Sequence, residues 1–333
     1  MTGVQTCALP ICERPHAPIG AEGATATLEG VSRWFGTTVA VADLSLDLFP
    51  GVTGLLGHNG AGKTTALKLL SGYDSPSAGR VRVLGVDPRR APAVYERVGI
   101  APEGALGWSF LSVAETVSAL AGMRGVRAPR EAAERAIELV GLEDAADRRV
   151  GDLSHGMRQR VKIAQALAHS PELLLLDEPL NGLDPGQREG VIELVTELGR
   201  QGRTVVISSH VLPEVERMAA RVLVLVNGRL VAEGAPAAIR RLMADVPRSV
   251  RVVVDRSPRA LAAELVGDEA VVSVEAAGPD QIVLETVDSE ALALALPGAA
   301  ATAGVVLRRV EPVGDDLESV YAHLHERARG ARG

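Results

Sequence analysis

The sequence predicts an α/β protein in which a parallel sheet carries a phosphate-binding loop. Three observations support this fold class: a glycine-rich loop at 57–64, a second apolar run at 173–176 that ends in two acids, and strand-like stretches that alternate with helical ones from 52 to 208. Strands that alternate with helices are typical of a parallel sheet. The 333 residues are enough for one large α/β domain and a smaller one.

Local patterns predict the elements around the loop. Alternating apolar residues indicate short strands within 25–49, after which a Pro-Gly pair signals a turn. Residues 52–56 form a strand pattern and 64–70 begin a helical one, which is the strand–loop–helix context that a phosphate loop requires. At 81–83, valines alternate with arginine, as in a half-buried strand.

A mostly helical insertion is predicted at about 104–170. Alanine and charged residues recur there at helical spacing, within 112–121, 129–140 and 155–168. The sheet then resumes with strands at 173–176, 204–208, 222–226 and 230–232 and a helix at 191–198. The last two strands form a hairpin whose Asn227-Gly228 pair suits a type I′ turn.

Near residue 241 the strand and helix pattern of the large domain ends and a new one begins. This change predicts a separate α+β domain at 241–333 after a large domain at 25–240. The expected elements are strands at 250–254, 271–276, 282–286 and 304–310 and helices at 258–266, 289–296 and 315–327. Without the last helix, the order βαββαβ resembles a ferredoxin-like fold. This domain carries no recognisable chemistry, and a stabilising cap is favoured over a regulatory role.

The N-terminal residues 1–24 are predicted to be a disordered tail. Residues 1–11, MTGVQTCALPI, resemble the translation of a common DNA-sequencing adapter, with a natural tail as the alternative. They lack the basic start and sustained apolar core of a secretory signal. Both cysteines, Cys7 and Cys12, lie in or beside this string, so the domain proper is free of cysteine, which is consistent with the cytosol.

Composition limits the classes of function. Hydrophobic residues make up 47% of the chain, yet no stretch reaches the ~18 apolar residues that a membrane-spanning helix needs. We therefore expect that the chain neither spans a membrane nor forms a pore alone. The formal net charge of −7 is mild, and no nucleic-acid partner is expected because such proteins usually present a basic face.

The loop at 57–64 fits the phosphate-loop pattern G-x-x-x-x-G-K-[ST]. Its glycines let backbone N–H groups point inward at phosphate oxygens, and the following helix presents its positive dipole end. Lys63 supplies a cation for the β and γ phosphates, and the Thr64 hydroxyl can ligate Mg²⁺. The candidate nucleotide-binding residues of this segment are Gly57, His58, Asn59, Gly60, Ala61, Gly62, Lys63, Thr64 and Thr65. An ordinary strand–helix turn is the alternative.

Asp177 and Glu178 follow four leucines that predict a strand buried on both faces. Ligands of open α/β sheets bind at the carboxyl ends of such strands. Asp177 can hold Mg²⁺ through water, and Glu178 can accept a proton from the water that attacks the γ phosphate. A solvated pair of strand-end acids is the alternative, which the upstream phosphate loop disfavours.

From about 28 to 234, the chain resembles the ABC transporter ATPase family. Leu153-Ser154-His155-Gly156-Met157 occupies the place of the LSGGQ signature, Asn181-Gly182-Leu183-Asp184 matches the loop after the second carboxylate strand, and Ser208-Ser209-His210 matches the strand that ends in histidine. The resemblance implies a P-loop NTPase fold of the ABC type with a helical insertion, ATP and Mg²⁺ as ligands, and ATP hydrolysis.

The same resemblance implies a head-to-tail homodimer. Each ATP would lie between the phosphate loop of one subunit and the signature of the other, where Ser154, Gly156 and Met157 would meet the nucleotide. Asp184 would pass information between the two sites, and His210 would contact the γ phosphate and help to hold the attacking water. Phe35 is the best match to the aromatic residue that stacks on adenine, with Trp34 as the alternative.

Two departures from the commonest family pattern mark a subfamily. Glu103 replaces the usual glutamine of the loop that ligates Mg²⁺, and a carboxylate can still bind the ion. The signature has His155 for glycine and Met157 for glutamine, as in many exporter-type members. This likeness implies an exporter subunit that energises a separate integral-membrane permease from the cytoplasm, peripheral to the inner face of the cell membrane.

Two other functions compete with the exporter interpretation. One is a regulator of the same family that acts on ribosomes or chromosomes, although such relatives usually carry two cassettes or long coiled coils. The other is a nucleotide-sensing module without turnover, which the presence of both Glu178 and His210 disfavours.

Overall fold

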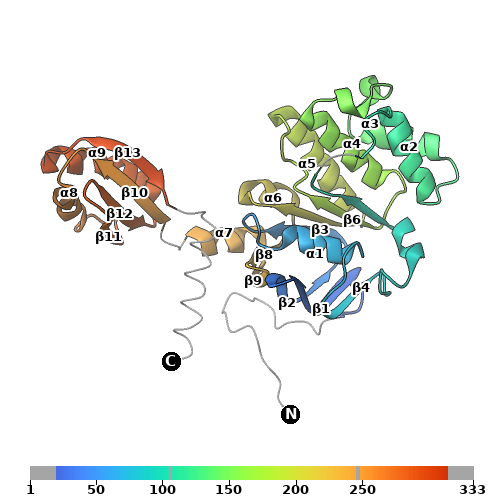
Figure 1. The fold of residues 1–333 in the computed structure, drawn as a ribbon, viewed down its shortest axis with the longest axis horizontal. Coiled ribbons are helices and arrows are strands. Elements are labelled where there is room, and N and C mark those ends of the chain that lie inside the picture. The colour runs from blue at the N-terminus through green and yellow to red at the C-terminus, as the bar shows by residue number, and fades with distance from the viewer. Residues whose placement is uncertain (1–19, 105–106, 245–247, 314–333) are drawn as a thin grey trace, which may run out of the picture. The chain divides into compact units, whose positions relative to one another are not determined.

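The computed structural model describes residues 20–104, 107–244 and 248–313, and its contacts divide the chain into two units, Met1–Ala237 and Ala238–Gly333 (Figure 1). The adapter-like string, both cysteines and the helix expected at 315–327 lie outside the described residues. Of the helices described, none is both long and apolar enough to cross a membrane.

The first unit contains a six-stranded sheet in the order β5-β6-β7-β3-β8-β9. The first five strands run parallel, as predicted, and β9 joins the edge antiparallel. Every residue of β6 is buried, as is typical of a parallel strand covered on both faces. The strands are β3 Gly51–Leu56, β5 Val98–Ala101, β6 Leu173–Asp177, β7 Thr204–Ser209, β8 Arg221–Val226 and β9 Arg229–Gly234.

Glycines allow two helices to approach β3 closely. A Cβ at Gly54 would lie 2.1 Å from Cγ1 of Val215 in α6, and a Cβ at Gly199 in α5 would lie 2.6 Å from Cγ2 of Val52. Real Cβ atoms do not come so near, so the helix–sheet distance depends on these glycines. The large sheet is covered by α1 Lys63–Leu70 on one face and by α5 Pro185–Arg200 and α6 Leu212–Met218 on the other, and α7 Pro236–Ala244 follows β9.

The predicted helical insertion is present as α2 Val113–Met123, α3 Pro129–Leu139 and α4 His155–Leu167, with short 3₁₀ turns at Glu143–Ala145 and Val150–Asp152. A further 3₁₀ turn, Pro92–Glu96, precedes β5. Ser112 and Glu115 start α2 with a reciprocal capping box. Proline at the first helical position starts α3.

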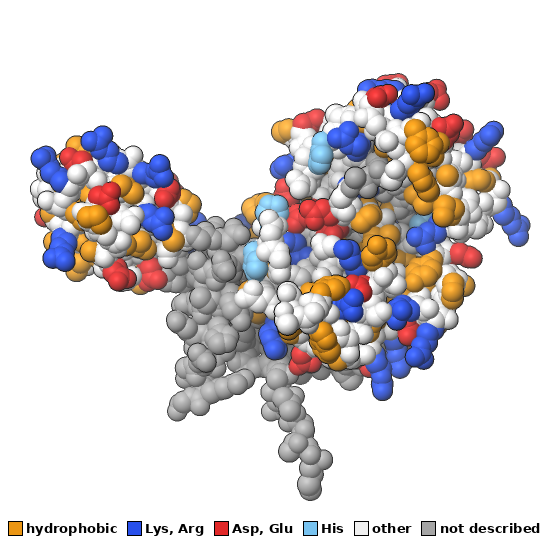
Figure 2. Space-filling model, in the orientation of Figure 1, with side chains coloured by type: hydrophobic (Ala, Val, Ile, Leu, Met, Phe, Trp, Pro, Cys, Tyr) orange, Lys and Arg blue, Asp and Glu red, His pale blue; other side chains and the backbone are white. Residues whose placement is uncertain are grey.

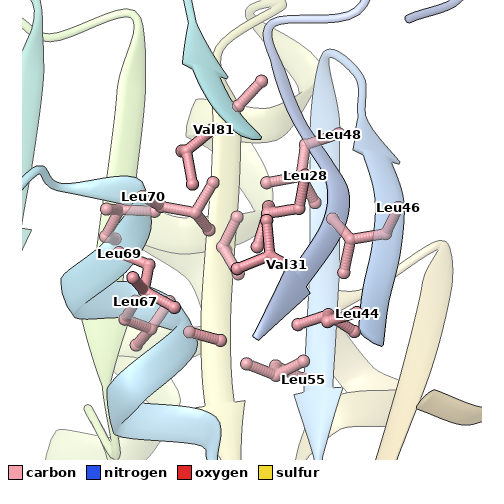
Figure 3. Close-up of a cluster of buried hydrophobic side chains, with 14 of the residues drawn as sticks. Leu28, Val31, Leu44, Leu46, Leu48, Leu55, Leu67, Leu69, Leu70 and Val81 are labelled. Atoms are coloured by element: carbon pink, nitrogen blue, oxygen red, sulfur yellow. The ribbon is translucent and has the colours of Figure 1, made fainter. Parts of the chain in front are cut away.

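A three-stranded antiparallel sheet, β2-β1-β4, packs against α1 and the large sheet. Its strands are β1 Ala26–Phe35, β2 Thr38–Leu48 and β4 Ala78–Val83. Figure 3 shows leucines and valines of these strands pointing toward the leucines of α1 and toward Leu55. A fully buried leucine contributes about 1.5–3 kcal/mol, so this cluster holds the helix behind the glycine-rich loop firmly on the sheet.

The hairpin between β8 and β9 confirms the predicted turn, since Asn227 and Gly228 both have positive φ, 47° and 76°. Three elements were not predicted: β5, α6 and α7. The helix expected at 289–296 is longer, because its buried face continues through Leu296 to Ala300 across Pro297, and Gly304 ends it in the left-handed conformation.

The second unit has the predicted order βαββαβ. Its elements are β10 Arg248–Val254, α8 Pro258–Leu265, β11 Ser273–Ala276, β12 Gln281–Thr286, α9 Ser289–Ala303 and β13 Leu307–Pro312. The sheet order is β11-β12-β10-β13, antiparallel throughout. The two helices cover one face and bury a separate core around Val252, Leu261 and Leu284.

Candidate functional site

The glycine-rich loop joins β3 to α1 and leaves the start of α1 without a side-chain cap. Gly60 and Gly62 have φ values of 83° and 100°, a region that favours glycine. The loop is held from both sides: the Gly57 N–H donates to Ser209 O at 3.3 Å, and the Gly228 N–H donates to Ala61 O at 3.0 Å. Uncapped N–H groups at a helix start favour an anion.

Lys63 places its ammonium inside this loop. Its side chain is only 6% exposed, and Nζ donates to Gly57 O at 2.6 Å and to His58 O at 3.2 Å. The same nitrogen lies 3.3 Å from Oε1 of Glu178. Two backbone carbonyls and one carboxylate thus hold this cation inside the loop. His58 is itself folded onto the loop, with Nδ1 2.7 Å from Asn59 O.

The two acids after β6 occupy different environments. Asp177 is buried and its Oδ1 accepts a hydrogen bond from Ser208 Oγ at 2.6 Å. That Oγ in turn accepts from the Glu178 N–H at 2.8 Å. Glu178 has a φ of 48°, a left-handed conformation that costs a residue with a Cβ roughly 1–2 kcal/mol. Strain of this kind is concentrated at functional sites.

His210 and Glu178 meet although 32 residues separate them. His210 follows β7 directly, and its Nδ1 lies 3.1 Å from Glu178 Oε2. The histidine side chain is 48% exposed, whereas that of Glu178 is 11% exposed. The carboxylate therefore lies between Lys63 and His210, with one oxygen toward each.

A cavity of about 820 Å³ opens beside these groups. It is lined by Thr64, Lys68, Glu103, Gly104, Ser109, Val150, Gly151, His155, Arg158, Gln159, Lys162, Asp177, Glu178 and Asn181. The three candidate metal ligands, Thr64, Glu103 and Asp177, thus line the same cavity. Hydroxyl and carboxylate oxygens are the donors that Mg²⁺ prefers, so the residues present fit that ion. Figure 2 shows acidic side chains next to histidine on the visible face of the first unit.

Two buried polar residues at the site were not singled out from the sequence. Gln159 in α4 donates from Nε2 to Glu178 O at 3.1 Å, and its Oε1 accepts from Lys162 Nζ at 3.1 Å. Burial lowers the pKa of the Lys162 ammonium, while Glu103 and Asp177 act in the opposite direction. The signal available in the sequence was a lysine placed between Val161 and Ile163 in the helical pattern at 155–168.

One residue of the signature, His155, lines this cavity. Ser154 caps α4, and its Oγ accepts from the Met157 N–H at 3.2 Å. Asp184 caps α5 by accepting from the Gln187 N–H at 2.9 Å. A Cβ at Gly156 would lie 2.4 Å from Gln187 Oε1, so the two helix starts are in close contact. Among the described residues that line the cavity, Ser154, Gly156, Met157 and Asp184 do not occur.

Both candidate aromatic residues are half-exposed at the tip of the β1–β2 hairpin. Phe35 is 48% exposed and Trp34 45%. The guanidinium of Arg33 lies 4.3 Å from the Phe35 ring centroid and also pairs with Asp74 at 2.7 Å. The hairpin reaches the loop, because Ala40 O would lie 2.5 Å from a Cβ at Gly62. Both aromatic side chains are therefore accessible on this hairpin, and the geometry does not choose between the two residues.

Comparison with known proteins agrees with this geometry. A family model described as ABC transporter matches residues 41–181. A Nod factor export ATP-binding protein I from Paraburkholderia xenovorans is 38% identical over 213 residues, 63% of this chain and 70% of that protein. The corresponding protein from Burkholderia orbicola is 37% identical over 239 residues, 71% of this chain and 78% of that protein.

Solved structures support the same assignment. The structure of the ATP binding subunit of an ABC transporter is 27% identical, has a TM-score of 0.59, and is matched over 65% of this chain and 92% of that chain. Together with the phosphate loop and the acids opposite it, these similarities show that the chain belongs to the ABC transporter family, as an ATP-binding subunit that hydrolyses ATP.

Proposed function

We propose that this chain powers an exporter by hydrolysing Mg-ATP in a homodimer that closes on nucleotide and opens after hydrolysis. The single observation that carries the proposal is the position of Glu178, whose two carboxylate oxygens face Lys63 at 3.3 Å and His210 at 3.1 Å beside the phosphate loop. A carboxylate that lies beside the phosphate loop and within hydrogen-bonding distance of a histidine is placed to receive a proton from water.

In this proposal the loop at 57–64 binds the phosphates and Lys63 neutralises their charge. Glu178 accepts the proton of the attacking water, and His210 orients that water through its ring. The Ser208 hydroxyl, bonded to Asp177 and to the Glu178 N–H, holds the two acids in register. Thr64, Asp177 and Glu103 would hold Mg²⁺, which when bound supplies charge stabilisation for the phosphates.

The signature completes the site from a second subunit. Ser154, Gly156, Met157 and Asp184 lie at two helix starts and do not line the cavity of their own chain, whereas His155 beside them does. Helix starts attract anions, so a second copy that brings Ser154 over the γ phosphate would bind ATP more tightly in the closed dimer than in the monomer. ATP then shifts the population toward the closed state. Phe35 or Trp34 would stack on the adenine.

Export is the direction favoured by the relatives, which are named as export ATP-binding proteins. We propose that dimer closure moves a separate integral-membrane permease through the helical insertion, with this chain at the inner face of the cell membrane. Recovery of the tagged chain from membranes together with a membrane protein that raises its turnover would support this step. A ribosome- or chromosome-bound chain would contradict it.

The shared site can be tested with two matched serine variants. Ser154 and Ser112 both cap a helix by accepting an N3 backbone N–H, at 3.2 and 3.1 Å, but only Ser154 belongs to the signature. In a Glu178→Gln background, we expect ATP to drive dimer formation, and Ser154→Arg to abolish the dimer while ATP still binds the monomer. Ser112→Arg should dimerise normally.

Size-exclusion chromatography with and without ATP, together with a nucleotide titration, reads out both properties. If the Ser154→Arg monomer loses ATP binding, the signature belongs to the site of its own chain and the proposed dimer is wrong. If Ser154→Arg dimerises as well as its background does, the signature takes no part in the interface.

A further inference from the structure

Two buried polar side chains in α4 connect the cavity to the backbone of Glu178. Gln159 is 4% exposed and Lys162 is 7% exposed. They are three residues apart, so they lie on the same face of the helix. Lysine is almost never buried to this degree unless it is paired, which indicates that this ammonium has a specific role.

The hydrogen bonds of Lys162 fix the orientation of the Gln159 amide. Nζ of Lys162 donates to Gln159 Oε1 at 3.1 Å, and Gln159 Nε2 donates to Glu178 O at 3.1 Å. A lysine ammonium has only donors, so it accepts nothing from an amide nitrogen. If the amide turned over, its NH₂ would face the ammonium and its oxygen would face the Glu178 carbonyl. Both contacts would be repulsive, so Lys162 selects one orientation.

That orientation matters because Glu178 is in an unfavourable backbone conformation. Its φ is 48°, and its peptide groups are held on both sides: the N–H by Ser208 Oγ at 2.8 Å and the carbonyl by Gln159. Conformations of this kind persist only where the surrounding contacts over-determine them. Loss of the Gln159 bond would free one side of the residue and let the carboxylate leave its place between Lys63 and His210.

The charge of Glu103 fits this arrangement. Glu103, Asp177 and Lys162 line the same cavity. The negative charges of both carboxylates favour the protonated form of the buried Lys162 ammonium, whereas the positive charge of Arg158 disfavours it. The guanidinium of Arg158 is itself bonded to Leu153 O.

We propose that Lys162 is a positioning residue that locks the Gln159 amide and thereby holds Glu178 in place for hydrolysis. The proposal rests on the role of Glu178 in the proposed function. Lys162 does not touch the reacting water in this arrangement, and it acts on the rate only through Gln159.

The first test is Lys162→Met, which keeps the length of the side chain and removes the ammonium. We expect kcat to fall by about tenfold, a part of the 10²–10⁴ that a placed general base contributes, while the Kd for ATP stays within twofold. Hydrogen–deuterium exchange of the segment 173–183 should become faster. Gln165→Met, a polar-to-apolar change one turn along the same helix, is the control and should leave kcat and exchange of that segment unchanged.

The second test is a double-mutant cycle with Gln159→Leu. Because Lys162 acts through Gln159, Lys162→Met should have no further effect on kcat in the Gln159→Leu background. If the losses of kcat in the two single variants multiply in the double variant, to about a hundredfold, the proposal is overturned. A parental kcat in Lys162→Met would also overturn it. Lys162→Arg retains a donor and a charge, and its recovery of most of the rate would separate positioning from a packing defect.

Hydrogen–deuterium exchange tests the link from Lys162 through Gln159 to Glu178 independently of whether the chain hydrolyses ATP. If the parent chain shows no turnover, the role of Glu178 fails, but faster exchange at 173–183 in Lys162→Met would still establish the link through Gln159. Unchanged exchange in Lys162→Met would refute the link whatever the turnover.

Discussion

Gly62, at the start of α1, offers a quantitative test of the loop geometry. Its φ is 100°, and a Cβ at this position would lie 2.5 Å from the backbone oxygen of Ala40. Gly60 is the matched control: it lies in the same loop and has a φ of 83°, but a Cβ there would have no atom within 4 Å. Gly60→Ala and Gly62→Ala therefore share the conformational cost, and only Gly62→Ala adds a steric clash.

The two costs can be estimated separately. A left-handed conformation costs a residue with a Cβ roughly 1–2 kcal/mol, and this is partly offset because alanine restricts the unfolded chain. Gly60→Ala should thus lower the free energy of unfolding by about 1 kcal/mol. In Gly62→Ala, the new Cβ would lie 2.5 Å from Ala40 O, and the backbone must move until this distance exceeds 3.0 Å. Overpacking of this kind costs about 1–3 kcal/mol more.

Urea unfolding followed by circular dichroism measures both variants, and a nucleotide titration shows whether the displaced loop still binds phosphate. We expect Gly62→Ala to be less stable than Gly60→Ala by about 1–3 kcal/mol and to bind ATP more weakly. Equal stability of the two variants would refute the close approach of the β1–β2 hairpin to the loop.

Four further outcomes are expected. Lys63→Ala should weaken ATP binding, because it removes the only cation within the loop segment 57–64, and an unchanged Kd would count against the loop assignment. His210→Ala should lower kcat while leaving the melting temperature nearly unchanged, since its side chain is half-exposed; a parental kcat would exclude its role. Leu175→Ala, at a fully buried position of β6, should cost about 2–5 kcal/mol in urea unfolding, and a loss below 1 kcal/mol would mean that the site is not tightly packed. Burial lowers the pKa of His169, so near neutral pH and below the unfolded chain binds a proton that the folded chain does not. The free energy of unfolding is therefore highest above the unfolded pKa of about 6.5 and falls as the pH drops below it. Melting curves of His169→Gln between pH 7.5 and 5.5 should lose less stability than those of the parent, and parallel losses would contradict this.

The sequence predicted the elements whose signals are local. The strand–loop–helix around 57–64, the apolar strand β6 and the hairpin turn at Asn227-Gly228 each have a short pattern with a direct physical cause. The order βαββαβ of the second unit was also predicted from periodicity alone. By contrast, the four-residue strand β5 was missed, because its pairing with β6 decides its conformation and Val98–Ala101 is too short to show a period.

Contacts at the site that depend on strand register could not be predicted from the sequence. Asp177 and Ser208 face each other only because β6 and β7 pair in that register. Likewise, Gln159 and Lys162 were read as part of a helical pattern, and their bonds to each other and to Glu178 arise from the packing of α4 against β6. Residue type suggested which side chains carry chemistry, whereas the supporting hydrogen bonds required the fold.

The role of Glu178 as proton acceptor is tested by Mg-ATP turnover of the purified parent chain and of Glu178→Gln, with ATP binding measured for both. We expect turnover in the parent, a loss of at least about a hundredfold in Glu178→Gln, and retained ATP binding in that variant. Hydrolysis by Glu178→Gln at the parental rate would show that this carboxylate, placed between Lys63 and His210, is not the group that receives the proton.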